Sequence, residues 1–223
     1  MNAYFKLEAL TFLVERYRHV VLLDCDTLTV SDYVDLNRES VEHILLYDVQ
    51  HRLSHAHRMR VIENNRVICG EAVSLIHYGG EILCGPATLL RPFVANCAEF
   101  ARTLRALCES RDVSAQDMGD EQLISMAAHR MATSIRIANA YLCRYWTGRN
   151  FRLLSTNYRF NAVDIWHLPA EKEGGLQTLY RHLVRHGEFP SSDACAKLAG
   201  LDRPNEGRVG SKWRRLRNRY WHG

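Results

Sequence analysis

The sequence predicts an α/β protein in which a sheet is flanked by helices. Runs of apolar residues bounded by polar ones, as in buried strands, alternate with segments whose apolar residues recur at helical spacing. The 223 residues include 47% hydrophobic and 24% charged side chains, a balance typical of a globular protein long enough to bury a core. No apolar run approaches the roughly 20 residues that a membrane-spanning helix needs. Because no signal peptide opens the chain either, we expect a cytoplasmic protein.

The first elements follow from apolar spacing. Residues 4–17 have the period of a helix that packs on a sheet. The apolar run of 17–30 predicts a buried strand directly after that helix, and 41–49 predict a second one. Between 51 and 60, three histidines and three arginines predict a polar loop or an exposed helix face. A short β-rich run over 73–77 then leads into paired glycines.

The second half of the chain shows the same alternation. Pro86 suits a helix start, and Gly119 followed by Asp120 resembles the N-terminus of another helix. We expect a tight turn or a sugar-lining segment at Gly79-Gly80. The remaining predicted elements are helices over 89–108, 176–186 and 192–199, and strands over 133–137, 141–146 and 163–167.

Two aspartates separated by one residue, Asp24 and Asp26, follow the first apolar run. If the strand continues through them, both side chains point to the same face. Carboxylates this close repel each other unless a cation lies between them, and oxygen ligands suit Mg²⁺ or Mn²⁺. The carboxyl ends of buried strands are also where open α/β sheets bind ligands. The pair therefore predicts a divalent cation that bridges to a substrate diphosphate.

Together with the helix and strand before it, Asp-x-Asp-Thr-Leu from Asp24 resembles the Asp-x-Asp region of GT-A fold nucleotide-sugar glycosyltransferases. The pattern is most similar to the retaining family 8 group, which includes lipopolysaccharide galactosyl- and glucosyltransferases and glycogenin. The resemblance implies a GT-A type mixed sheet and a metal-dependent hexosyltransferase. Its donor would be a nucleotide sugar such as a UDP-sugar, and its acceptor a glycan or glycolipid such as lipopolysaccharide or capsular polysaccharide.

Later segments extend this resemblance. Residues 157–167 are similar to a family segment whose histidine is the third protein ligand of the metal, which implies that role for His167. The same comparison implies substrate contacts for Asn161, and for Gly80 and Glu81 at the place of the sugar-lining segment. Lys172 falls near the family lysine that touches the diphosphate.

The segment that starts at Asp120 resembles the family element that presents an acidic or amide side chain beneath the donor sugar. This resemblance implies catalytic roles for Asp120 and Gln122. Capping of the helix by Asp120 is an equally complete explanation of the acidic side chain at this position.

Two other functions stay open. Phosphatases of the haloacid dehalogenase type also place two aspartates after an apolar strand, but they require a threonine where this chain has Leu28. A degenerate or fragmentary GT-A scaffold could act as a binding protein. Metal-dependent nucleotide binding separates that role from an active transferase.

One departure from the family concerns the residues before the aspartate pair. Only 23 residues precede Asp24, whereas the family has about three strand-helix units there that build the nucleoside pocket. We expect these nucleoside-binding strands to be lacking, through a fragment or late start, a partner chain that supplies them, or degeneration. A sheet without its first strands exposes apolar surface, so a homo-oligomer is expected.

Residues 1–203 are expected to form one domain, followed by a basic aromatic tail over 204–223. From Arg208 onward the tail has six Lys or Arg residues and three large aromatic side chains. Such a tail could bind an anionic membrane surface peripherally, and we expect no nucleic-acid partner. The seven cysteines are scattered and never in Cys-x-x-Cys spacing, which predicts reduced thiols without a zinc site.

Overall fold

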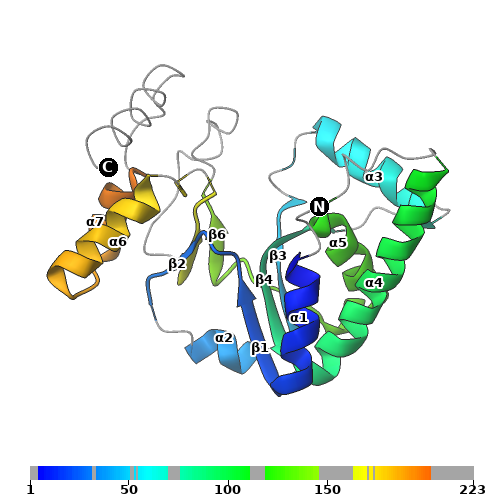
Figure 1. Cartoon of the computed structure of the whole chain (residues 1–223), viewed down its shortest axis with the longest axis horizontal. Coiled ribbons are helices and arrows are strands. Elements are labelled where there is room, and N and C mark those ends of the chain that lie inside the picture. Colours follow the sequence, from blue (N-terminus) through cyan, green and yellow to red (C-terminus); the bar gives the residue numbers. More distant parts are fainter. Residues whose placement is uncertain are drawn as a thin grey trace. The chain divides into compact units, whose positions relative to one another are not determined.

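The computed structural model describes residues 5–31, 34–50, 53, 55–69, 76–110, 119–145, 163–169, 171–172 and 174–201. The chain forms two compact units, the first from 1–24 and 34–139 and the second from 25–33 and 140–223. Each unit has a mixed sheet and helices of its own (Figure 1), so the predicted α/β class is confirmed. The single domain over 1–203 stays a prediction, and the tail over 204–223 lies outside the described residues.

The sheet of the first unit has four strands in the order β1 (His19–Leu23), β4 (Tyr78–Pro86), β3 (Ile44–Asp48) and β5 (Ile135–Ile137). β4 is antiparallel to both of its neighbours, whereas β5 runs parallel to β3. Every residue of β4 except Pro86 is buried. A strand with a partner on each edge and helices packed against it is expected to be buried along its length.

Three helices cover this sheet, α1 (Phe5–Arg16), α4 (Ala87–Glu109) and α5 (Asp120–Arg130). α1 packs on β1 and α4, and α5 packs on β4 and α4. Figure 1 shows the three helices gathered beside the strands of this unit. Their fully buried contributions to the core include Leu10, Leu90, Phe93 and Leu123. The unit also contains α2 (Val34–Glu39) and α3 (His55–Cys69).

The second unit is built on a three-stranded sheet in the order β2 (Thr27–Thr29), β7 (Ile165–His167) and β6 (Leu142–Arg144). β2 is antiparallel to β7, and β6 is parallel to it. Two helices, α6 (Gly175–His186) and α7 (Ser192–Ala199), complete the core around Trp166. The indole of Trp166 is fully buried and meets the Tyr145 ring edge-on, with the ring centroids 5.6 Å apart.

Most predicted elements are present with slightly different bounds. The helices predicted over 89–108, 176–186 and 192–199 are α4, α6 and α7. The last two end at glycines in the left-handed conformation, Gly187 with φ of 73° and Gly200 with φ of 81°, where glycine is favoured. The histidine- and arginine-rich segment begins a longer helix than expected, because α3 continues to Cys69.

Two local predictions are wrong. The strand does not continue through the aspartate pair, because β1 ends at Leu23 and Asp26 lies in a turn before β2. Nor do the paired glycines form a tight turn, since both lie inside β4. The pairing of β4 with β3 shifts register at this point, so that residues 80–82 bulge from the ladder.

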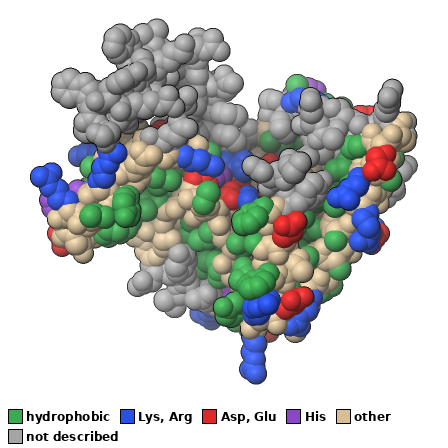
Figure 2. Space-filling model, viewed as in Figure 1, with side chains coloured by type: hydrophobic (Ala, Val, Ile, Leu, Met, Phe, Trp, Pro, Cys, Tyr) green, Lys and Arg blue, Asp and Glu red, His purple; other side chains and the backbone are tan. Residues whose placement is uncertain are grey.

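The outer surface of α1 carries large apolar side chains. Phe5 is 72% exposed and Phe12 is 53% exposed. Figure 2 shows hydrophobic side chains on the face of the molecule over this helix. A homo-oligomer stays a prediction. Among the described residues, no helix is both long and apolar enough to cross a membrane.

Candidate functional site

Asp24 follows β1 and is held by its backbone and its side chain. Its amide donates to the Glu81 carbonyl on the neighbouring strand, at 3.0 Å. Its carboxylate Oδ1 lies 2.6 Å from Nζ of Lys6, near the start of α1. The helix that packs on β1 therefore places a cation at the end of that strand.

Lys6 contacts more than Asp24. Its Nζ lies 3.3 Å from Oδ2 of Asp120, the first residue of α5, and donates to the Gly80 carbonyl at 3.1 Å. Burial of the ammonium lowers the pKa of Lys6, but the hydrogen bond to Asp24 and the charge of Asp120 outweigh burial and raise it above its ordinary value. Lys6 thus stays charged between two carboxylates.

Asp26 lies in the second unit and is almost completely buried, with 2% of the residue exposed. Its backbone carbonyl accepts from the Leu168 amide at 2.9 Å, and β2 pairs Thr27 with His167. These two pairings bring Nε2 of His167 to 3.1 Å from Oδ1 of Asp26. Residues 141 positions apart in the chain therefore meet, as the family resemblance implied.

Lys172 supplies the counter-charge of Asp26. Its Nζ lies 2.8 Å from the second carboxylate oxygen, Oδ2, and its side chain is 54% exposed. Burial raises the pKa of Asp26, but the hydrogen bond to Lys172 and the attraction of His167 outweigh burial and lower it below its usual value. Asp26 is therefore an ionised carboxylate at neutral pH.

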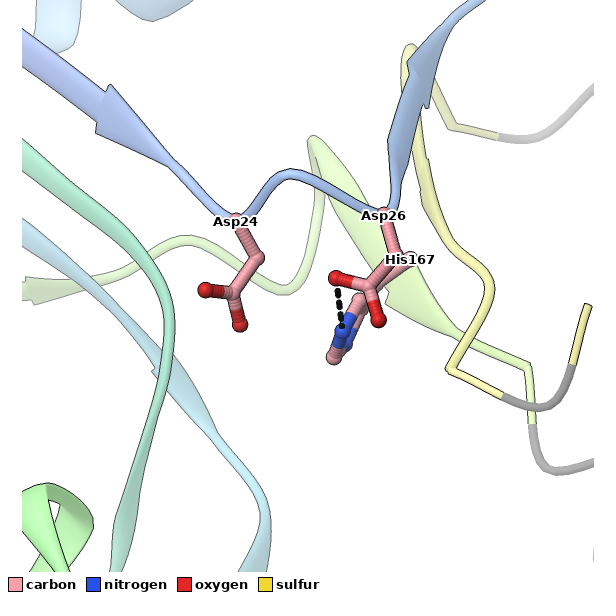
Figure 3. A group of neighbouring side chains, drawn as sticks. All are labelled: Asp24, Asp26 and His167. Carbon is pink, nitrogen blue, oxygen red and sulfur yellow. Dashed lines mark hydrogen bonds and ion pairs between the residues drawn. The ribbon is translucent and has the colours of Figure 1, made fainter. Parts of the chain in front are cut away.

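Asp24, Asp26 and His167 form a group that could hold a metal ion (Figure 3). One residue separates the two aspartates, so the chain itself keeps their Cα atoms within about 7 Å of each other. Two carboxylates and one imidazole are a reasonable donor set for a divalent cation such as Mn²⁺. Each carboxylate already has an ammonium within 3 Å, which shows that both attract cations.

The other predicted site residues lie in different surroundings. Gly80 faces the Lys6 ammonium, and a Cβ on this glycine would lie 2.7 Å from Nζ and 3.0 Å from the Asp120 carboxylate. Glu81 is fully buried. Gln122 is buried as well, and its amide donates to Oδ1 of Asn65 on α3. The sugar contacts predicted for Gly80 and Glu81, and the catalytic roles of Asp120 and Gln122, stay predictions.

Asn161 lies outside the described residues, so its predicted substrate contact stays a prediction. The residue that sequence reasoning missed is Lys6. The sequence did contain one signal that singles out Lys6, which is the rarity of lysine: only four of the 29 basic residues are lysines.

No family model and no curated protein matches the sequence. Among solved structures, the chain aligns with mouse xyloside xylosyltransferase 1 in its apo form, with a TM-score of 0.49 and 13% sequence identity. The alignment covers 75% of this chain and 63% of that one, so the chain spans less than two thirds of the mouse protein's length.

Proposed function

We propose that the protein is a metal-dependent glycosyltransferase of the GT-A type, similar to family 8. It would move a hexose from a nucleotide sugar, such as a UDP-sugar, to a glycan or glycolipid. The observation that carries this proposal is the contact of Asp26 with His167 at 3.1 Å. That contact joins the Asp-x-Asp motif to the late histidine, the two parts of the sequence resemblance that imply a shared metal.

Asp24, Asp26 and His167 would hold the cation, Mn²⁺ or Mg²⁺. A bound divalent cation supplies Lewis-acid stabilisation of the negative charge that develops on a departing diphosphate. Burial suits Asp26 for this role, because charges interact more strongly where water is excluded. The hydrogen bond from Leu168 to the Asp26 carbonyl fixes the backbone, so the carboxylate is already oriented.

The basic residues of the site suit an anionic donor. Lys172 is half-exposed, and its ammonium is within reach of Asp26, so it could contact phosphate oxygens beside the cation. Asp120 presents its carboxylate at the start of a helix, fixed by Lys6. Glycosyl transfer passes through an oxocarbenium-like state, which a carboxylate beneath the sugar stabilises. We propose Asp120 for that position, because the amide of Gln122 is engaged with Asn65.

The acceptor is proposed from chemistry that the sequence suggests. An anionic glycan or glycolipid, such as a lipopolysaccharide core or a capsular polymer, fits the histidine- and arginine-rich start of α3 and the basic tail. We further propose that the tail binds the membrane surface peripherally and that the protein acts on the cytoplasmic side.

Isothermal titration calorimetry tests the donor site. UDP, UDP-glucose and UDP-galactose are titrated into the purified chain with and without Mn²⁺. Asp26→Asn removes the charge at nearly constant shape, and Glu188→Gln is the matched control, because Glu188 is exposed in the same unit. We expect binding that needs Mn²⁺, is lost in Asp26→Asn and is unchanged in Glu188→Gln.

Release of UDP from the donor, measured in parallel, separates catalysis from binding. Slow Mn²⁺-dependent hydrolysis of a bound UDP-sugar would support a transferase. Binding without any turnover would favour a scaffold that binds nucleotide sugars but does not transfer them. A folded protein that binds neither UDP nor UDP-sugars with Mn²⁺ would refute the proposal.

A further inference from the structure

Lysine is rare in this chain, yet two of its four lysines contact the aspartate pair. Lys6 lies 2.6 Å from Asp24, and Lys172 lies 2.8 Å from Asp26. Each lysine belongs to the same compact unit as its aspartate. In a chain in which arginine supplies nearly all the positive charge, the choice of lysine at both carboxylates calls for a physical reason.

Lysine and arginine hold a carboxylate differently. The planar guanidinium of arginine forms two parallel hydrogen bonds to a carboxylate, whereas the ammonium of lysine is a single point charge on a flexible stem. The chain uses the arginine fork elsewhere, where Arg130 forms two hydrogen bonds to the Glu99 carboxylate, at 2.8 and 2.9 Å. A lysine therefore leaves each aspartate with a counter-ion that is easier to remove.

We infer that Lys6 and Lys172 are exchangeable counter-ions, which neutralise the aspartate pair until a divalent cation binds and then give up the carboxylates. This inference rests on the metal site of the proposed function. A cation bound to a carboxylate oxygen lies about 2.0–2.2 Å from it, close to an ammonium on the same carboxylate. Two positive charges at that separation repel each other strongly, so the ammonium moves away.

The ammonium groups of the two lysines move to different surroundings when the cation binds. Lys172 is 54% exposed, so its ammonium can move into water. Lys6 is 27% exposed and has a second carboxylate at 3.3 Å, that of Asp120, together with the Gly80 carbonyl at 3.1 Å. On exchange, Lys6 shifts toward Asp120 and stays in the site. Metal binding to Asp24 is thereby linked to the charge around the carboxylate proposed to lie beneath the sugar.

Mn²⁺ affinity, measured by electron paramagnetic resonance of the free ion without any nucleotide, tests the exchange. Lys6→Met and Lys172→Met remove the competing ammonium, and each should tighten Mn²⁺ binding by about two- to fivefold. Lys6→Arg and Lys172→Arg replace it with a bidentate cation and should weaken binding by a similar factor. Lys197→Met, on the exposed side of α7, removes one positive charge away from the aspartates and should change nothing.

A second readout follows the lysines themselves. Reductive ¹³C-methylation keeps the charge and gives one NMR signal for each lysine, assigned with the variants above. Addition of diamagnetic Mg²⁺ should shift the signals of Lys6 and Lys172 and leave that of Lys197 in place. A purely structural ion pair would show loss of stability on substitution but no such shift.

The inference is overturned if wild-type protein binds Mn²⁺ and UDP together while the methionine variants bind Mn²⁺ no more tightly. That outcome would leave the proposed function intact. Conversely, tighter Mn²⁺ binding by the methionine variants, with no UDP-sugar binding in any form, would support the exchange and refute the transferase. Absence of Mn²⁺ binding in wild type and all variants would refute both.

Discussion

Replacement of Trp166 by alanine should destabilise the second unit and disturb the candidate metal ligand beside it. Trp166 is fully buried in β7, directly before His167, and packs edge-on against Tyr145. A buried indole removes about 200 Å² of surface from water, worth about 5 kcal/mol at 25 cal/mol per Å². Measured losses for such truncations are about 3–5 kcal/mol, because neighbours relax only partly into the cavity.

Urea unfolding, followed by circular dichroism, measures this cost. Since the urea dependence of small domains is about 1–3 kcal/mol per molar, Trp166→Ala should lower the transition midpoint of the second unit by at least about 1 M. Trp166→Phe keeps an aromatic ring and should lose less. Val184→Ala, at an exposed position of α6, is the matched control and should change stability by less than about 0.5 kcal/mol.

The Mn²⁺ affinity of the folded Trp166→Ala protein provides the link to the site. A cavity under β7 loosens the strand that holds His167, so we expect weaker binding in conditions where the protein is still folded. A stability loss below about 1 kcal/mol would refute the assignment of Trp166 to the core of this unit. Unchanged Mn²⁺ affinity would show that β7 does not position the imidazole.

Three further predictions concern charge, thiols and close packing. Because the folded pKa of Asp26 lies below its ordinary value of 3.8, its stabilising contribution is complete above that pH and lost as the pH falls through the folded value. Urea midpoints of Asp26→Asn should therefore vary less with pH below 4. Burial raises the pKa of the Cys97 thiol to about 12, so thiol reagents at pH 8 should spare it. Cys25 is exposed, so Cys25→Ser should remove the fastest phase of labelling among the cysteines whose side chains the structure describes. In Gly175→Ala the new Cβ would clash with the backbone carbonyl oxygen of Ala199 in α7, so calorimetric unfolding should show a loss of about 1–3 kcal/mol in stability. Gly119→Ala is the control, because its new Cβ meets no atom within 4 Å.

The sequence was informative where local chemistry decides the structure. Apolar spacing located α4, α6 and α7, and Pro86 marked the start of α4, because proline favours a helix start whatever the rest of the chain does. The break after β1 depended on long-range pairing instead. β1 pairs with β4 and β2 pairs with β7, in two different sheets, and the apolar run itself contains no sign of this division.

The candidate site was predictable only in part. Two motifs placed Asp26 and His167 in one site, and their side chains lie 3.1 Å apart, while their role as metal ligands stays a prediction. Lys6 was missed because a lysine at the start of a helix does not reveal which distant carboxylates it meets. Asp120 and Gln122 were grouped as one catalytic element, yet residues two positions apart on a helix point about 200° apart around its axis. They accordingly meet different partners, Lys6 and Asn65.

The early position of β2 has a consequence for folding during synthesis. This strand belongs to the second unit, but its partner β7 comes after the whole helical part of the first unit. At about 5–20 residues per second, the 141 positions between Asp26 and His167 take a ribosome about 7–28 seconds to translate. During that interval the first unit can complete its four-stranded sheet, whereas β2 cannot pair because β7 has not yet been synthesised. During synthesis, the contact between Lys6 and Asp24 can therefore form long before His167 and Lys172 are available to contact Asp26.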